Sequence, residues 1–193
     1  MTLAVTGYGS KIVSELSQLL PAGEEVVRLT DETHKADRFL LCAGLLRPKT
    51  LLEQTGQEIR ESLLVNLIQP IQACDEILRF NPKARIVVMG SESGFSWSYD
   101  GAYAAAKAAL HRYVETKKLG PHQQLVCVAP SIIENAGMTL RRLDVDNLKK
   151  RMDTHPKHRF LKAIEVARMI HFLLYVDEGY TTGTVIRMNG GGC

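Results

Sequence analysis

The chain has 193 residues, of which 45% are hydrophobic, so we expect one domain over residues 1–193 with a single large core. The formal net charge is only +3 at pH 7, and the basic residues are interspersed with acidic ones, which argues against a nucleic-acid-binding or membrane-surface protein. The sequence shows neither a signal peptide nor an apolar run long enough to span a bilayer, and we expect a cytoplasmic protein.

The amino-terminal region has the pattern of a strand, a glycine turn and a helix. Residues 2–6 are an apolar strand-like run, Gly7-Tyr8-Gly9-Ser10 follows directly, and apolar residues at helical spacing continue over residues 12–20. Such a turn lets the backbone approach the pyrophosphate of a dinucleotide, which the free N–H groups of the helix then hold. The full fingerprint has a third glycine where this chain has Ile12, and Gly-x-Gly also occurs in ordinary tight turns.

Two further apolar runs end in small or polar residues. Residues 37–44 finish with Cys42-Ala43-Gly44, and residues 86–91 finish with Gly90-Ser91. In open α/β sheets, ligands bind beyond the carboxyl ends of the strands. We therefore expect these two strand ends to form a ligand site together.

The rest of the chain alternates between helical and strand-like segments. We expect helices at residues 56–80, 101–119 and 163–175, and further strands at residues 25–29, 124–129 and 184–188. This alternation predicts an α/β fold, a Rossmann-like doubly wound parallel sheet of about six strands. Pro70 lies inside the first of these helices, so we expect a kink near Asn66.

Tyr103 and Lys107 lie four residues apart in an alanine-rich helical segment. This spacing puts both side chains on one face of a helix, where the ammonium group of Lys107 is expected to lower the pKa of the Tyr103 phenol. The phenol would then serve as an acid or a base near neutral pH. A Tyr and a Lys also meet at this spacing by chance in amphipathic helices, so the pair by itself does not identify a catalytic site.

The chain resembles the short-chain dehydrogenase/reductase family over residues 3–192. The family's Tyr-x-x-x-Lys pair, strand-end serine, helical asparagine, Asn-Asn-Ala-Gly segment, Pro-Gly-x-Ile-x-Thr stretch and closing glycine-rich strand all have counterparts here. These counterparts are Tyr103 and Lys107, Ser91, Asn66, Leu41-Cys42-Ala43-Gly44, residues 130–135 and residues 183–191. The order and the spacing agree throughout, so the assignment rests on several motifs together.

The resemblance implies an NAD(P)-dependent oxidoreductase that interconverts a small-molecule carbonyl and an alcohol by hydride transfer. In this family the tyrosine, here Tyr103, moves the proton, and the lysine, here Lys107, holds the nicotinamide ribose. Ser91 would hydrogen-bond the substrate oxygen, and Asn66 would position a water that connects Lys107 to solvent. The residues expected to bind the cofactor are Gly7, Tyr8, Gly9, Ser10, Lys11, Ile12, Thr30, Cys42, Ala43, Gly44, Tyr103, Lys107, Pro130, Ser131, Ile133 and Asn135.

Two departures from the family pattern concern the cofactor half. The glycine turn is contracted, with Lys11 and Val13 at the positions of the later family glycines. Too few residues separate residues 26–30 from Asp37 for the usual helix, strand and second helix, so one edge strand is expected to be missing. The adenine is then exposed unless residues 31–36 cover it. These departures motivate a second hypothesis, a dinucleotide-binding regulatory or inactive relative of the family, and a third, an α/β domain that binds no dinucleotide.

The choice between NADP and NAD depends on charge near the end of the second strand. An acidic side chain there favours a free ribose hydroxyl, and a basic one favours a 2′-phosphate. The chain offers Thr30, which suits either cofactor, and Asp31, which would repel a phosphate if it faced inward. Lys11 and Arg28 could bind that phosphate, and the balance slightly favours NADP.

Residues 135–160 are strongly polar and basic, and in this family the corresponding segment forms a lid over the substrate. The positive charge would suit an anionic substrate, but a solvated helical face balanced by its own aspartates is the preferred explanation. In the preceding loop, Phe95, Trp97 and Tyr99 alternate along the sequence. They would either line the substrate pocket or cover the core.

The cysteines and histidines show no spacing typical of a disulfide framework or a metal site. We expect free thiols, no metal, and surface or helix-face histidines, with His111 among them. As is usual in the family, contact through the helices that carry Asn66 and Tyr103 would make the protein a homodimer or homotetramer. The motifs do not identify the substrate, because specificity resides in loops that vary independently of the scaffold.

Overall fold

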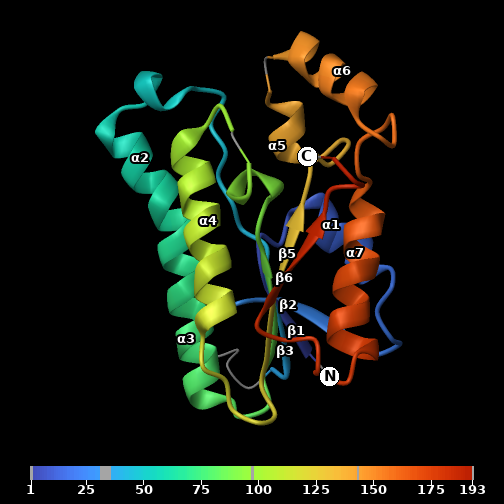
Figure 1. Cartoon of the computed structure of the whole chain (residues 1–193). Helices are drawn as coiled ribbons and strands as arrows, with labels where there is room; N and C mark the ends of the chain where they lie inside the picture. Colours follow the sequence, from blue (N-terminus) through green and yellow to red (C-terminus); the bar gives the residue numbers. More distant parts are fainter. Residues whose placement is uncertain (1, 31–35, 97, 143, 193) are drawn as a thin grey trace.

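Six parallel strands form one sheet in the computed structural model, which describes residues 2–30, 36–96, 98–142 and 144–192 (Figure 1). The strands are β1 (Thr2–Thr6), β2 (Glu25–Arg28), β3 (Arg38–Leu41), β4 (Arg85–Met89), β5 (Gln124–Pro130) and β6 (Thr184–Met188). Their order across the sheet is β2-β1-β3-β4-β5-β6, and every neighbouring pair is parallel. The predicted Rossmann-like parallel sheet is confirmed, and β2 lies at its edge.

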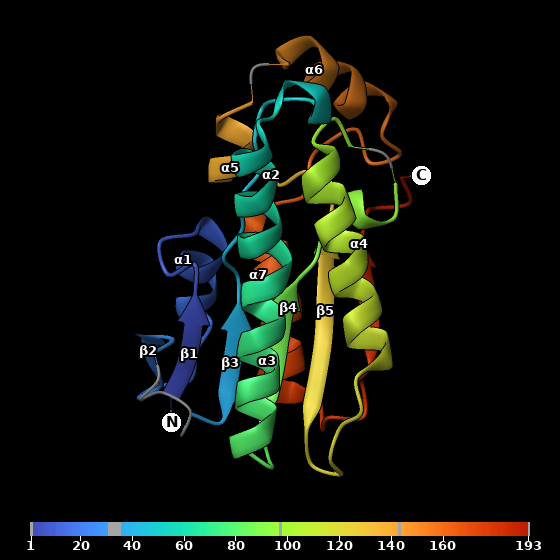
Figure 2. The same ribbon diagram turned by 90° about the vertical axis from the view of Figure 1, so that its left-hand side faces the viewer.

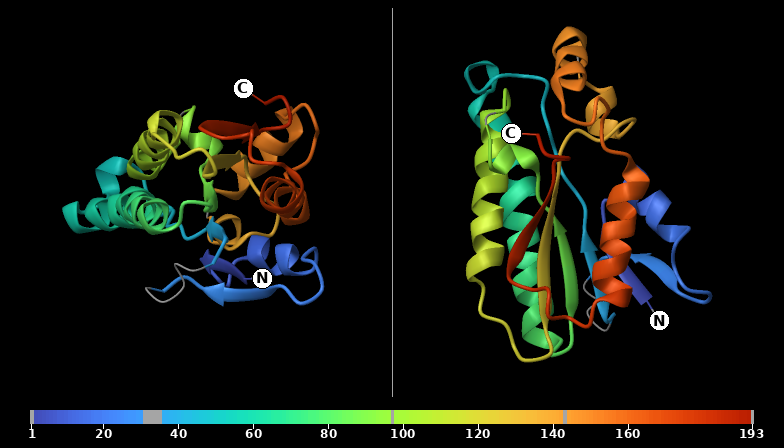
Figure 3. Two further views of the ribbon diagram at one scale, coloured as in Figure 1. Left: turned by 90° about the horizontal axis from the view of Figure 1, so that it is seen from below. Right: turned by 45° about the vertical axis from the view of Figure 1, so that its right-hand side comes forward.

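Helices cover both faces of this sheet (Figures 2 and 3). One face carries α2 (Gly56–Leu63), the π-helical turn η3 (Leu64–Ile68), α3 (Gln69–Phe80) and α4 (Gly101–Thr116), and the other carries α1 (Lys11–Ser17), α7 (Ala163–His171) and the π-helical turn η5 (Phe172–Val176). Successive strand residues point to opposite faces, so Leu40 joins the core under α1 and α7 while Phe39 and Leu41 join the core under α3 and α4.

The helix predicted over residues 56–80 is interrupted near Asn66, as expected from Pro70. Proline has no N–H to donate to the carbonyl four residues earlier, which here is that of Asn66. The chain accommodates this at η3, where the N–H of Gln69 donates to the carbonyl of Leu64, five residues back. Asn66 is therefore fully buried within a π-helical turn, a feature that often occurs at functional sites.

The structure differs from the sequence-based prediction in two helical segments. The helix that carries Tyr103 and Lys107 ends at Thr116, before the expected end at residue 119. The polar segment at residues 135–160, for which a solvated helical face was predicted without bounds, contains two separate helices, α5 (Gly137–Leu140) and α6 (Val145–Thr154). Neither of these helices has a fully buried residue, and hydrophobic periodicity, the main sign of a helix in a sequence, is correspondingly weak.

The carboxyl ends of the strands point toward α5 and α6, as the arrowheads of β5 and β6 show (Figure 1). Two short 3₁₀ turns, η2 (Leu51–Glu53) and η4 (Glu92–Gly94), follow β3 and β4. The chain leaves β1 toward β2 on one side and returns to β3 on the other, so the order of the strands reverses between β1 and β3. In doubly wound sheets a ligand crevice lies at this reversal.

Among the described residues, no helix combines the length and apolar character needed to cross a bilayer.

Candidate active site

Tyr103, Ser91 and Lys107 meet at the carboxyl end of β4. Tyr103 lies in the first turn of α4, only 6% of it is exposed, and the Ser91 side chain is near enough to its hydroxyl to influence its pKa. The Nζ of Lys107 donates to the main-chain carbonyl of Met89 over 2.7 Å and lies 5.7 Å from the centroid of the Tyr103 ring. The fold thus brings the Tyr103 and Lys107 pair of one predicted segment together with Ser91 of another.

Burial dominates the electrostatics of this trio. Removal from water raises the pKa of Tyr103 to about 12, although the Ser91 side chain acts in the opposite direction. The pKa of Tyr103 is thus raised, whereas the sequence analysis expected Lys107 to lower it; among the described residues, Lys107 is not one of the groups that shift this pKa. Burial also lowers the pKa of Lys107 to about 8.

Asn66 holds the loop after β3 through its side chain. Its Nδ2 donates to the carbonyl of Leu45 over 2.7 Å and to that of Ser62 over 2.9 Å, and its Oδ1 accepts from the N–H of Leu45 over 3.0 Å. The amide is thus committed to the protein. The main-chain carbonyl of Asn66 cannot accept a hydrogen bond from residue 70, because proline has no N–H.

Asp100 is a residue of this site that the sequence analysis missed. It is fully buried, and its carboxylate caps α4 by accepting from the N–H of Tyr103 over 3.1 Å. The same carboxylate accepts from Nε2 of Gln54 and from the N–H of Arg47, each over 2.9 Å. An aspartate directly before a helical segment is an N-cap signal, so the local sequence did contain a clue to this residue.

The turn between β1 and α1 is built for close approach of backbone to backbone. Gly7 has φ +67°, and a Cβ there would lie 2.8 Å from the carbonyl carbon of Cys42. Beside Gly9, in contrast, a Cβ would meet no atom within 4 Å. Ser10 caps α1 by accepting from the N–H of Val13 over 3.2 Å, so the turn is fixed while one side of it remains open.

The end of β3 lies directly beside this turn. The hydroxyl of Thr6 accepts from the N–H groups of Cys42 (2.9 Å) and Ala43 (3.1 Å), and the Sγ of Cys42 lies 3.5 Å from the Oγ of Ser10. At Gly44, a Cβ would approach the terminal methyl of Met138 to 2.8 Å. The flexible end of the Met138 side chain, from the polar segment after β5, therefore lies close to the end of β3.

The other residues predicted to bind a cofactor have separate environments. Lys11 forms an ion pair with Glu15 over 3.0 Å, and the side chain of Ile12 is part of the core, which leaves only the main chain of Ile12 available to a ligand. Thr30 is exposed just after β2. Tyr8, also exposed, lies under the guanidinium of Arg28, 5.4 Å from its ring centroid.

The segment after β5 lies at the same end of the sheet. Pro130 ends β5, and the N–H of Ser131 donates to the carbonyl of Met188 over 3.1 Å. The side chain of Ile133 is buried, and its main-chain carbonyl accepts a hydrogen bond from the hydroxyl of Thr139 over 2.7 Å. Asn135 is a non-glycine residue with φ +56°, which marks a sharp turn into α5.

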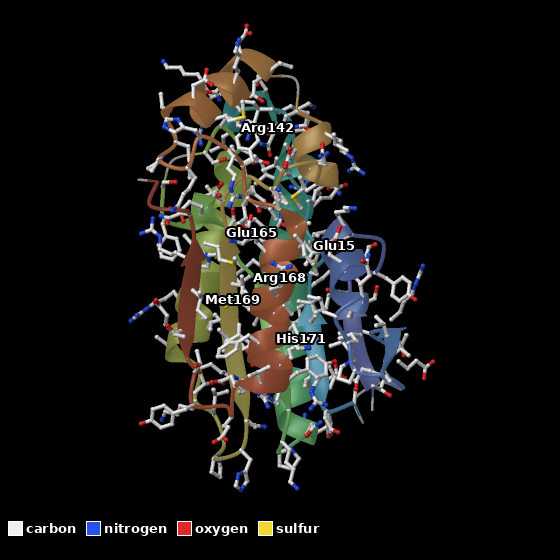
Figure 4. All side chains as sticks on the ribbon, turned by 90° about the vertical axis from the view of Figure 1, so that its right-hand side faces the viewer. Glu15, Arg142, Glu165, Arg168, Met169 and His171 are labelled. Atoms are coloured by element: carbon white, nitrogen blue, oxygen red, sulfur yellow. The ribbon has the colours of Figure 1, made fainter. Side chains whose placement is uncertain are left out.

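The polar segment contains an ion pair between Arg142 and Asp144. Arg142 binds Asp144 through two hydrogen bonds of 2.9 and 2.5 Å and lies 5.0 Å from the centroid of the Tyr99 ring, at the end of the molecule marked in Figure 4. This pairing neutralises the charge of Arg142. Tyr99 lines a surface cavity of about 360 Å³ together with residues of η2.

The predictions that concern Trp97 and Asp31 cannot be compared with the structure, because residues 31–35 and 97 lie outside the described ranges.

Phe95 is half exposed and packs on His111, with ring centroids 4.6 Å apart. His111 is on a helix face, as predicted, but it is buried and not at the surface. In the described part of the chain, no three His, Cys, Asp or Glu side chains are grouped as metal ligands.

Comparison with known proteins places this geometry in context. The family model described as enoyl-(acyl carrier protein) reductase matches residues 22–192. The 3-oxoacyl-[acyl-carrier-protein] reductase FabG of Aquifex aeolicus is 32% identical over 192 residues, which cover 96% of this chain and 75% of that protein. Carbonyl reductase family member 4 of Xenopus tropicalis is 32% identical over 170 residues, which cover 84% of this chain and 69% of that protein.

Solved structures share the fold at lower sequence identity. A short-chain dehydrogenase/reductase from Burkholderia thailandensis superposes with a TM-score of 0.83 at 20% identity, covering 98% of this chain and 91% of that one. A structure of ElxO with NADPH bound has a TM-score of 0.79 at 17% identity and covers 98% of this chain and 97% of that one.

Proposed function

Because the chain belongs to the short-chain dehydrogenase/reductase family and is an oxidoreductase, we propose that it interconverts a carbonyl and an alcohol with NADP or NAD as the hydride carrier. The observation that carries this proposal is the burial of Tyr103 beside the Ser91 side chain, with the ammonium of Lys107 5.7 Å from the centroid of the Tyr103 ring. A proton donor, a second hydrogen-bonding group and a cation at one strand end are what carbonyl reduction requires.

The residues at the ends of β1 and β3 support binding of a dinucleotide. The open space beside Gly9 lies at the start of α1, where main-chain N–H groups suit a pyrophosphate, and Gly7 lets this turn pack on the end of β3. Lys107 has three N–H donors, of which Met89 takes one. The others would hold the hydroxyls of the nicotinamide ribose.

The chain's own residues would act on the substrate oxygen. Tyr103 has a pKa of about 12, so its phenol is protonated at neutral pH and can give a proton to a carbonyl oxygen. The hydroxyl of Ser91 would donate a hydrogen bond to the same oxygen and stabilise the negative charge that develops there. When bound, the reduced nicotinamide supplies the hydride that adds to the carbonyl carbon. Alcohol oxidation reverses these roles, with the phenolate as the base.

NADP is the cofactor we favour, on the strength of the stack between Arg28 and Tyr8. Since β2 is the edge strand, no further strand shields this side of the crevice among the described residues. The exposed ring of Tyr8 and the guanidinium of Arg28 stand there instead, 5.4 Å apart. Arginine is well suited to bind a 2′-phosphate. A structural neighbour binds NADPH, as described above.

The proposal also includes a lid over the substrate, a homo-oligomer and a cytoplasmic location. Residues 135–160 would act as a lid over the substrate, because Met138 and Arg142 reach the backbone of Gly44 and the ring of Tyr99. A homodimer or homotetramer would bury the exposed side chains of Leu64 and Ile68 on η3, and sedimentation velocity would reveal it. A cytoplasmic location suits the free thiols of Cys42, Cys74 and Cys127.

The experiment measures NADPH and NADH consumption with ethyl acetoacetate and acetoacetyl-CoA as probe substrates, beside thermal stabilisation by each cofactor. Tyr103→Phe should lower turnover by about 10²- to 10⁴-fold without loss of cofactor binding. The control, Tyr113→Phe, removes a hydroxyl on the same helix that bonds Asp75 at the surface, and it should keep turnover. Cofactor binding without turnover of either probe would favour the regulatory or inactive relative. Absence of stabilisation by both cofactors would overturn dinucleotide binding.

A further inference from the structure

His111 lies on the same face of α4 as Tyr103 and Lys107, one turn beyond the lysine. Only 4% of the residue is exposed. Its ring fills a slot between the end of β4 and η4. A Cβ at Gly90 would lie 2.5 Å from its Nε2, and a Cβ at Gly94 would lie 2.5 Å from its Cε1. Both glycines are thus needed for this imidazole to fit.

The imidazole accepts a hydrogen bond from the backbone of the predicted active site. The N–H of Ser91 donates to Nε2 of His111 over 3.3 Å. This bond requires the tautomer with the proton on Nδ1. Burial, followed by the positive charges of Lys107 and Arg187, lowers the pKa of His111 to about 4, so the ring is neutral and able to accept at neutral pH.

The main-chain N–H of Ser91 is not held by the hydrogen bonds of the sheet. The last ladder bond between β4 and β5 is donated by the N–H of Gly90 to the carbonyl of Val128 over 2.8 Å. The next N–H, that of Ser91, has left the strand and bonds to His111 instead. The Ser91 side chain accepts from the N–H of Ser93 over 3.2 Å, so both its main chain and its hydroxyl have fixed partners.

Packing alone does not explain a histidine at this position. The Nδ1 atom of His111 is buried and has no hydrogen-bond partner among the described residues. A buried polar atom without a partner destabilises the folded state. A leucine would fill much of the same slot without this cost, so the acceptor at Nε2 is the property that distinguishes histidine here.

We propose that His111 is a positioning residue that fixes the backbone of Ser91 to the helix carrying Tyr103, and so sets the spacing between their two hydroxyl groups. It touches neither substrate nor cofactor and acts through Ser91. The catalytic consequence rests on the function proposed above, but the contact itself can be tested without turnover.

The first test measures hydrogen exchange at the Ser91 amide by NMR. His111→Leu removes the acceptor and should speed exchange at this amide by about tenfold or more relative to the neighbouring β4 amides. His111→Gln retains an oxygen acceptor and should restore the protection. Equal protection of the Ser91 amide in the wild type and in His111→Leu would overturn the proposal whether or not the protein turns over a substrate.

The second test is a double-mutant cycle in kcat with NADPH and ethyl acetoacetate. His111→Leu should lower kcat about tenfold when Ser91 is present and less than about twofold in a Ser91→Ala background, because the two residues act through one group. Losses that multiply would show that His111 acts by another route. His171→Leu, at the far end of α7 (Figure 4), is the control and should leave kcat unchanged.

Discussion

The ammonium group of Lys107 donates a hydrogen bond to the carbonyl of Met89 over 2.7 Å while it lies 5.7 Å from the centroid of the Tyr103 ring. The lysine therefore connects the last residue of β4 to the helix that packs on that strand. Its charge is almost completely removed from water. This burial lowers its pKa, and among the described residues only the thiols of Cys127 and Cys42 act in the opposite direction. Burial of this charge lowers the free energy of unfolding, but it keeps a cation at the site.

This cost predicts a specific pH dependence of stability. The pKa of Lys107 is lowered to about 8, whereas the unfolded chain keeps about 10.5. Between these values the unfolded state binds the proton more tightly, so folding is disfavoured below pH 8 and the penalty declines as pH rises to 10.5. The full effect is about 3 kcal/mol, from 1.36 kcal/mol per pKa unit.

Urea unfolding of the wild type and of Lys107→Met checks this prediction. The stability of the wild type relative to the variant should rise between pH 8 and 10.5. A difference that stays constant over this range would contradict the assigned pKa.

Gly7→Ala and Gly9→Ala should separate folding from cofactor binding. An alanine at position 7 would have a positive φ and would meet the backbone of Cys42 at 2.8 Å, so we expect a loss of about 2 kcal/mol or more in the free energy of unfolding. An alanine at position 9 meets no atom within 4 Å, and it should leave stability nearly unchanged while it weakens stabilisation by NADP(H). Equal losses of stability in both variants, seen in thermal unfolding, would argue against these distinct roles.

Arg28→Ala should weaken NADP(H) binding by about tenfold or more and leave NAD(H) binding nearly unchanged, because only NADP carries the 2′-phosphate. Arg79→Ala is a matched control, since Arg79 also stacks on an aromatic ring, that of Phe80 at 5.2 Å. Isothermal titration with each cofactor measures the effect. A similar loss for NAD(H) and NADP(H) would show that Arg28 does not discriminate between them.

Asp100→Ala should lower the free energy of unfolding by about 2–4 kcal/mol, because three donors lose the buried carboxylate that binds them. Asp100→Ser should recover part of this loss, since a hydroxyl still accepts from the N–H of Tyr103. Urea unfolding of both variants gives the comparison. A loss below about 0.5 kcal/mol in Asp100→Ala would be inconsistent with a capping role.

Local sequence patterns were sufficient to predict much of the framework. Apolar runs with small residues at their carboxyl ends identified β3 and β4, and the four-residue spacing placed Tyr103 and Lys107 on one helix face. Pro70 indicated the interruption of the helix at η3. These features depend on covalent geometry and on the periods of strands and helices, which a sequence contains directly.

Burial could not be predicted in the same way, because it depends on segments distant in the chain. The phenol of Tyr103 has a raised pKa, contrary to expectation, since neighbouring elements exclude water from it. His111 has the spacing of an ordinary helix-face histidine, and only the approach of Gly90 and Gly94 encloses its ring. The sequence by itself determined the order of the elements and the types of chemical groups, whereas the tertiary structure decided which groups are desolvated and which partners they bind, because solvent exclusion requires surfaces that only folding brings together.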